Sequence, residues 1–196
     1  SSVQSPLLAA PWMAMTATAT PLFPSKFLHA NSLRFHYVET GPADGEPVLF
    51  LHGFPEYWYS WRYQLAACGQ AGHRAIAPDL RGYHLSDKPP GVASYHMDHL
   101  LDDVVGIVEA LGLRQVNLVA HDWGGAIAWA VAASPKHRHV VKRLVVMNAP
   151  HPAAFLSRMS LSQLRKSWYM LFFQLPFLPE RWMAKHQHAG IRRAFQ

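Results

Sequence analysis

The stretch "LVAHDWGGAIAW", residues 118–129, decides the fold. Its first half is a short apolar run typical of a buried strand, and its second half has the Ala-rich composition of a helix. Between them the chain passes through Asp122, Trp123 and two glycines, which predicts a sharp turn from strand into helix. A carboxylate at such a corner is either a helix cap or a nucleophile raised on a tight turn, and this stretch alone leaves both interpretations open.

Strands and helices alternate on both sides of this corner. Residues 26–41 alternate apolar and polar side chains around a turn at 30–32, which predicts a β-hairpin. Further apolar runs typical of buried strands occupy residues 47–53, 73–79, 115–121 and 141–150. Helical spacing is found at residues 61–72, 97–111 and 124–135, and Gly112 is placed to end the second of these helices.

This order predicts an α/β fold, a mostly parallel sheet with helices on both faces, because the strands are too apolar to have a face in water. In such sheets ligands bind at the carboxyl ends of the strands. Three loops follow predicted strand ends, at residues 52–58, 79–87 and 121–125. We therefore expect the chemistry of the protein to lie on these loops.

The chain is divided into three parts by composition. Residues 1–25 carry no charge and are predicted to form a disordered leader, and residues 26–151 form the α/β core. Residues 152–196 are helical, aromatic and basic in pattern and predict part of a helical cap, with no Val/Ile-rich strand after it. No apolar run reaches the roughly 18 to 20 residues that span a bilayer, so no membrane span is predicted.

Charge and cysteine content exclude several classes of function. The formal net charge is +6, but from Lys136 onward 11 Lys/Arg stand against one acidic residue, while residues 1–135 carry 7 against 11. The basic residues come singly among apolar ones, which disfavours nucleic-acid binding. Cys68 is the only cysteine and Cys/His zinc spacing is absent, so we predict no disulfide, no metal and a reducing, cytoplasmic compartment.

A second loop supplies what a nucleophile at Asp122 would need. The sequence His52-Gly53-Phe54-Pro55 follows a predicted strand at the position where the backbone N–H groups of Phe54 and Trp123 would form an oxyanion hole. A carboxylate is already charged at neutral pH and can attack saturated carbon directly, giving an ester on the enzyme. An aspartate at this corner therefore favours epoxides or alkyl halides over carboxylic esters as substrates.

At this point the chain resembles the α/β-hydrolase family, and within it the epoxide hydrolases. The matching pieces are "HGFPEYWYSWR", "DLRGYHLSDKP", "VAHDWGG", "MNAPHP" and "SWYMLFFQLP". One departure is His84, where the family usually has glycine. Because histidine adopts positive φ only reluctantly, this residue is expected to alter the conformation of its loop.

The resemblance implies an epoxide hydrolase that opens a small apolar epoxide to a diol, with water as second substrate and no cofactor. It implies Asp122 as nucleophile, through an alkyl-enzyme ester, and Tyr169 as the cap proton donor. By periodicity alone, Tyr169 belongs to an aromatic core stripe of the cap instead. The residues that the resemblance places in the substrate site are His52, Pro55, Trp123 and Phe172, beside the oxyanion-hole residues Phe54 and Trp123.

Several parts of such an enzyme are expected beyond residue 196. In this fold the triad order is nucleophile, acid, then histidine, so the base, its carboxylate, the last strands and a second cap tyrosine are expected there. The 196-residue chain is then expected to form the ester without turning over.

The alternatives are a haloalkane or haloacid dehalogenase of the same fold, or a non-catalytic ligand-binding protein. Against the first, Phe54 stands where haloalkane dehalogenases usually carry asparagine, and no arginine follows Asp122. The sequence predicts no particular oligomer.

Overall fold

The computed structural model describes residues 23–151 and residue 153. The chain divides into two compact units, Ser1–Ala149 and Pro150–Gln196, and almost all described residues belong to the first. Tyr169 and Phe172 of the predicted cap lie outside the described residues. The folded core begins slightly before the predicted boundary at residue 26, because Ser25 already starts the first strand and Phe23 packs edge-on against Trp58 with ring centroids 6.1 Å apart.

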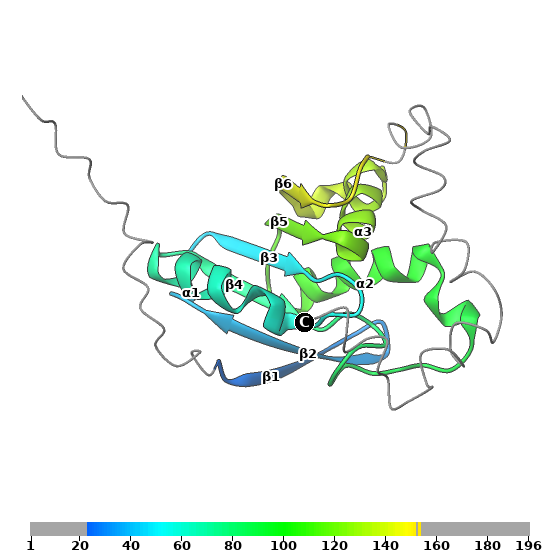
Figure 1. Ribbon diagram of the computed structural model, residues 1–196, viewed down its shortest axis with the longest axis horizontal. Helices are drawn as coiled ribbons and strands as arrows, with labels where there is room; N and C mark the ends of the chain where they lie inside the picture. Colours follow the sequence, from blue (N-terminus) through cyan, green and yellow to red (C-terminus); the bar gives the residue numbers. More distant parts are fainter. Residues whose placement is uncertain (1–22, 152, 154–196) are drawn as a thin grey trace, which may run out of the picture. The chain divides into compact units, whose positions relative to one another are not determined.

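Six strands form one sheet in the described part of the chain (Figure 1). They are β1 (Ser25–Ala30), β2 (Leu33–Thr40), β3 (Pro47–Leu51), β4 (Arg74–Pro78), β5 (Val116–His121) and β6 (Val141–Met147). Their order across the sheet is β1-β2-β4-β3-β5-β6. The pairs β1/β2 and β2/β4 are antiparallel, and β4, β3, β5 and β6 run parallel to one another. The predicted hairpin and the mostly parallel sheet are both confirmed.

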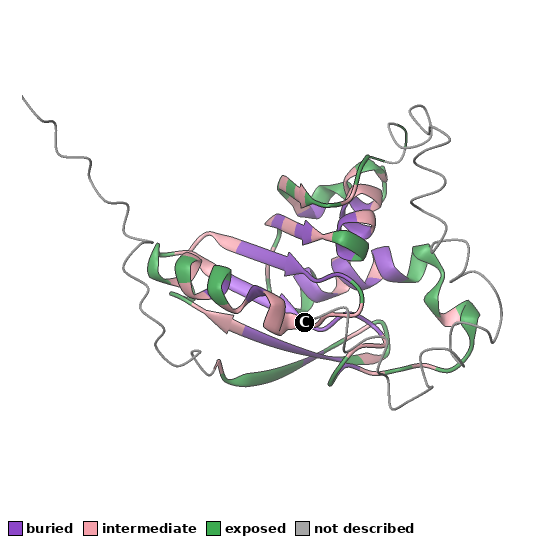
Figure 2. Cartoon of the chain, viewed as in Figure 1, coloured by how far each residue is buried: buried purple, intermediate pink, exposed green. Residues whose placement is uncertain are grey.

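Helices cover both faces of this sheet. The α-helices are α1 (Arg62–Gln70), α2 (Met97–Ala110) and α3 (Asp122–Ala133), and short 3-10 turns occupy η2 (Trp58–Trp61), η3 (Val92–Tyr95) and η4 (Arg138–Val140). One core contains Leu65 of α1 with Val38 and Phe50 of the sheet. The other core lies on the opposite face of the sheet and contains buried residues of α2 and α3 packed against strand side chains that point to that face. Figure 2 shows the buried residues concentrated along the central strands and the inward faces of the helices.

The helix α2 follows the predicted apolar spacing closely. Leu100, Leu101, Val104 and Val108 are buried, and Gly112 lies at φ +71 just after the helix, in the left-handed conformation typical of a helix end. Asp103 is also buried on this helix, although a carboxylate interrupts the apolar pattern. Among residues 23–151, no helix combines the length and apolar character that a membrane crossing requires.

Candidate active site

The corner at Asp122 is a direct junction between strand and helix. β5 ends at His121 and α3 begins at Asp122, whose φ of +49 lies in the left-handed region. A residue other than glycine costs free energy in that region and persists there only when its surroundings impose it, which is common at functional sites. The strand and helix are therefore joined by a strained residue that carries a carboxylate.

Close packing beneath this corner requires glycine at position 124. The Gly124 N–H donates to the carbonyl O of His52 at 3.1 Å, which joins the start of α3 to the loop after β3. A Cβ at position 124 would lie 2.5 Å from that same oxygen and 2.6 Å from the carbonyl O of Leu51. Both obstacles are backbone atoms that cannot move independently, so only glycine permits this approach.

The substitution Gly124→Ala is expected to lower the free energy of unfolding by about 3 kcal/mol, the upper end of the cost of overpacking. Urea unfolding followed by circular dichroism measures the change. Gly112→Ala is the control, because no atom lies within 4 Å of its added Cβ and only the strain of φ +71, about 1 kcal/mol, applies. An equal loss in the two variants would contradict the steric explanation.

The Asp122 carboxylate is bonded to the neighbouring loop. Its Oδ1 accepts a hydrogen bond from the Phe54 N–H at 3.0 Å. The N-cap position of α3 is His121, and no side chain caps the helix there. The side chain of Asp122 is thus directed at the loop after β3. A helix-capping aspartate would instead accept from an N–H group of α3, so the observed bond does not fit the helix-cap interpretation.

His52 is fully buried beneath this loop, and both its ring nitrogens are bonded inside the protein. The Leu80 N–H donates to Nε2 at 2.9 Å, so Nδ1 carries the proton and donates to the Gly53 carbonyl O at 2.9 Å. Burial lowers the pKa of His52, which keeps the ring neutral. This placement favours a positioning role for His52 over the predicted contact with substrate.

Phe54 and Trp123 both line a cavity of about 430 Å³. Both side chains are partly exposed. The Trp123 N–H lies in the first turn of α3, where N–H groups have no acceptor within the helix and where the helix dipole favours negative charge. The structure therefore brings together the two predicted oxyanion-hole residues. Pro55 follows Phe54 through a cis peptide bond and does not line this cavity.

The loop after β4 supplies cavity residues that the sequence did not single out. The lining comprises Phe54, Leu80, Arg81, Gly82, Tyr83, Tyr95, Leu100, Trp123 and Ile127. Burial, and secondly the negative charge of Asp122, raise the pKa of Tyr83 to about 12, so its phenol stays protonated. Its ring also packs edge-on against His52, with centroids 4.8 Å apart. The sequence feature that could have identified Tyr83 as a site residue is its position in a loop at the carboxyl end of a strand.

His121 directly precedes Asp122 but lines a different cavity. Its Nδ1 lies 3.4 Å from Oε2 of Glu56, and its Nε2 accepts from Nδ2 of Asn148 at 3.2 Å. It lines a second cavity of about 220 Å³ together with Glu56 and Met147, separate from the one at Trp123. These contacts give His121 a structural role in joining β5 to Glu56 and Asn148.

A family model described as the alpha/beta hydrolase fold matches residues 46–194. The chain belongs to the α/β-hydrolase family. Epoxide hydrolase 2 of Caenorhabditis elegans is 44% identical over 173 residues, covering 87% of this chain and 48% of the relative. Epoxide hydrolase 3 of Xenopus tropicalis is 47% identical over 167 residues, covering 83% and 44%.

Solved structures agree with these sequence relatives. The Bacillus megaterium epoxide hydrolase variant F128A, complexed with its product (R)-3-[1]naphthyloxy-propane-1,2-diol, superimposes with a TM-score of 0.78 at 36% identity, covering 86% of this chain and 58% of that structure. The α/β-hydrolase chain spans about half the length of the curated relatives it matches. The resemblance to epoxide hydrolases drawn from the motifs is confirmed.

Proposed function

We propose that this α/β-hydrolase chain opens epoxides through an ester formed on Asp122. The observation that carries the proposal is the carboxylate of Asp122, held on a strained corner at φ +49, bonded to the Phe54 N–H and next to the cavity at Trp123. The similarity to epoxide hydrolases of several organisms supports the same substrate class. The largely apolar lining of the cavity suits a small apolar epoxide.

The hydrogen bond from Phe54 assigns different tasks to the two carboxylate oxygens. Oδ1 is occupied by the Phe54 N–H, so Oδ2 attacks the epoxide carbon, the new C–O bond forms, and the ring C–O bond breaks to leave an alkoxide. In the resulting ester Oδ1 is the carbonyl oxygen. When water adds to the ester carbon, negative charge develops on Oδ1, where the N–H groups of Phe54 and Trp123 stabilise it by about 10² to 10³ in rate for each donor.

Hydrolysis of the ester requires a base, and neither histidine beside the corner is placed to serve. His52 uses both ring nitrogens for backbone contacts, and His121 is bonded to Glu56 and Asn148. We therefore propose that the 196-residue chain forms the ester faster than it hydrolyses it. The covalent intermediate is then expected to accumulate and to be observable.

The test is the intact mass of the chain after incubation with styrene oxide, followed by peptide mapping and by circular dichroism of the unmodified chain. We expect the mass to increase by one epoxide per chain, carried by the peptide that contains Asp122. A folded chain without an adduct, or one modified elsewhere, would contradict the proposal. Parallel incubation with 1-bromobutane tests the dehalogenase alternative, which predicts bromide release and an alkyl ester instead.

The opened epoxide needs a proton, and we propose Tyr169 as its donor on the strength of the family motif "SWYMLFFQLP". Tyr169→Phe is expected to slow ester formation from styrene oxide by about 10² to 10⁴, the usual value of general acid catalysis. The rate of adduct formation measured by mass spectrometry checks this. Trp168→Phe, a neighbouring aromatic substitution, is the control. Equal rates for Tyr169→Phe and the unaltered chain would instead support the aromatic core stripe.

A further inference from the structure

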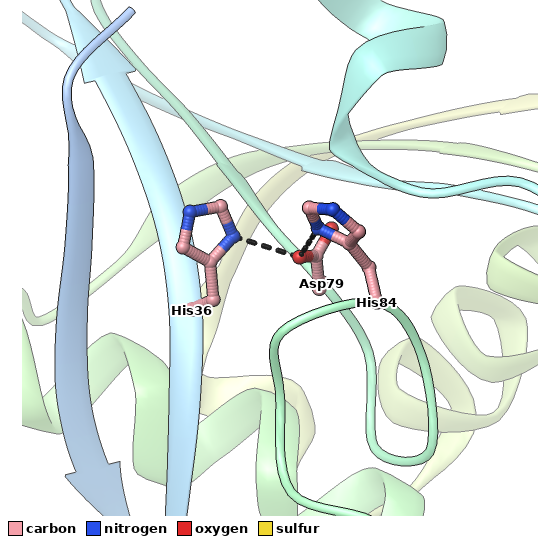
Figure 3. Close-up of side chains that lie close together, drawn as sticks. All are labelled: His36, Asp79 and His84. Atoms are coloured by element: carbon pink, nitrogen blue, oxygen red, sulfur yellow. Dashed lines mark hydrogen bonds and ion pairs between the residues drawn. The ribbon is translucent and has the colours of Figure 1, made fainter.

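Three side chains meet near the carboxyl end of β4 (Figure 3). His36 comes from β2, and Asp79 and His84 come from the loop that follows β4. The Nδ1 atoms of both histidines lie 2.7 Å from the same oxygen, Oδ2 of Asp79. All three potential ligand atoms lie within 4.8 Å of one another. His36 and Asp79 are fully buried, while the side chain of His84 is 37% exposed and faces solvent in part.

The surroundings orient these groups toward one another. Oδ1 of Asp79 accepts from the Trp58 N–H at 3.0 Å, while Oδ2 faces the two rings and also accepts from the Leu85 N–H at 3.4 Å. Nε2 of His36 lies 3.0 Å from Oγ of Ser25. A serine hydroxyl both donates and accepts, so the contact with Ser25 is retained whichever nitrogen of His36 carries the proton. His36 can therefore free its Nδ1 for a ligand without leaving a buried polar atom unpaired.

His84 is held in place at a conformational cost. Its φ of +40 lies in the left-handed region that glycine accommodates and that histidine adopts only reluctantly. The backbone strain at this position is therefore carried by His84 itself. Nζ of Lys88 donates to the His84 carbonyl O, and the ring of Tyr57 packs over the imidazole with centroids 4.5 Å apart. Strain of this kind is maintained at binding sites, and here it places an imidazole beside a buried carboxylate.

We propose that His36, Asp79 and His84 form a binding site for one divalent transition-metal ion of the zinc class. Two imidazole nitrogens and one carboxylate oxygen are a donor set that Zn²⁺, Co²⁺ and related ions prefer, whereas Mg²⁺ and Ca²⁺ prefer oxygen donors alone. Zinc bonds of about 2.0 to 2.1 Å in a tetrahedral arrangement separate neighbouring ligand atoms by about 3.3 Å. Both 2.7 Å hydrogen bonds must therefore open by about 0.6 Å. The partly exposed His84 can move away from Asp79, and the contact between the buried His36 and Asp79 has to open by small shifts of those two side chains.

Binding would move the ring protons from Nδ1 to Nε2 without releasing them, and the carboxylate of Asp79 would offset one of the two positive charges of the ion. Each Nδ1 must be unprotonated to bind the ion, so the proton of His36 moves to Nε2, which then donates to Oγ of Ser25. This matches the usual pattern in which a ligating histidine donates its other N–H to a second group. A fourth ligand would be water, which can reach the partly exposed His84. The ion would tie β2 to the loop after β4.

The test is titration of the metal-stripped chain with Zn²⁺ by isothermal calorimetry and with Co²⁺ by absorption spectroscopy. We expect one ion per chain and a rise in the unfolding temperature with Zn²⁺, because an ion that binds only the folded chain stabilises it. His84→Asn keeps a residue that tolerates positive φ but removes the imidazole, and we expect it to weaken Zn²⁺ binding by at least about 100-fold. His99→Ala, an exposed histidine on α2, is the matched control and should bind as the unaltered chain does.

Binding that survives in His84→Asn, or no binding by the folded chain at millimolar Zn²⁺, would overturn the proposal. Circular dichroism separates loss of the site from loss of the fold. If His84→Asn fails to fold, His84→Gly carries the residue usual in the family and gives the same comparison. These measurements do not depend on epoxide chemistry. The metal-site proposal can therefore be rejected while the proposed ester formation on Asp122 stands, and ester formation can be rejected while the metal site stands.

Discussion

Replacing Asp122 with asparagine is expected to abolish covalent capture of styrene oxide by this chain. The asparagine amide is uncharged and does not attack saturated carbon, whereas its oxygen can still accept from the Phe54 N–H, so the corner keeps its hydrogen bond. Removal of the nucleophile from a hydrolase costs at least about 10⁴ in rate. The measurement is the fraction of modified chain against time by intact mass, compared with the unaltered protein.

Two controls make the loss specific to Asp122. Asp98→Asn removes an exposed carboxylate in the first turn of α2 and should leave the rate of capture unchanged. Circular dichroism of the Asp122→Asn chain should match that of the unaltered chain, since asparagine tolerates the φ of +49 better than most residues. Capture by Asp122→Asn at the original rate would mean that another group forms the adduct, and the proposed mechanism would be wrong.

The strands and helices were predictable because the spacing of apolar residues along this chain matches the period of each strand and helix. The hairpin, the buried strands and α2 all lie within a few residues of their predicted positions. The helix α3 begins at Asp122, two residues before the predicted start at Gly124. The two glycines weaken helix propensity, and Gly124 is required because α3 packs against the carbonyl O atoms of Leu51 and His52, which leaves no room for a side chain at position 124. Such contacts are invisible in one sequence.

The candidate site was predictable in its location but less in its details. The loops after β3 and β5 converge because parallel strands end at one edge of the sheet, which brings Phe54 to Asp122. The roles of individual side chains depend on distances across the fold. His52 turned out to be buried against Leu80, and Tyr83 came close enough to Asp122 for its pKa to respond. A sequence pattern indicates which loops meet, but it does not reveal which atoms do.

A buried ion pair between Arg81 and Asp103 carries the largest expected effect on stability. Nε and Nη2 of Arg81 donate to the two oxygens of Asp103 at 2.6 and 2.7 Å, and Nη1 donates to the Ser94 carbonyl O at 2.7 Å. The side chain of Asn31 also donates to Asp103, at 3.2 Å. The hydrogen bonds to Asp103 are the largest cause that raises the pKa of Arg81. Together, the bonds of Arg81 and Asn31 connect α2 with the loop after β4 and the β1/β2 turn.

Asp103→Ala is expected to lower the free energy of unfolding by about 3 to 5 kcal/mol, because it leaves the Arg81 guanidinium buried without its counter-charge. Urea unfolding measures the loss. The neighbouring Asp102→Asn is the matched control: Asp102 pairs with Lys136 and His137 at a more exposed position of the same helix, and asparagine keeps an acceptor for both, so the change should cost no more than about 1 kcal/mol. Similar losses for the two variants would contradict this account.

The double substitution Arg81→Met with Asp103→Leu separates the pair's own contribution from the cost of an unpaired charge. Replacing a buried ion pair by apolar side chains of similar volume is often neutral or stabilising. We therefore expect the double variant to unfold at a higher urea concentration than Asp103→Ala alone. If it is equally unstable, the hydrogen bonds to Ser94 and Asn31 hold the loop, and the charge of Asp103 matters less than its oxygen atoms.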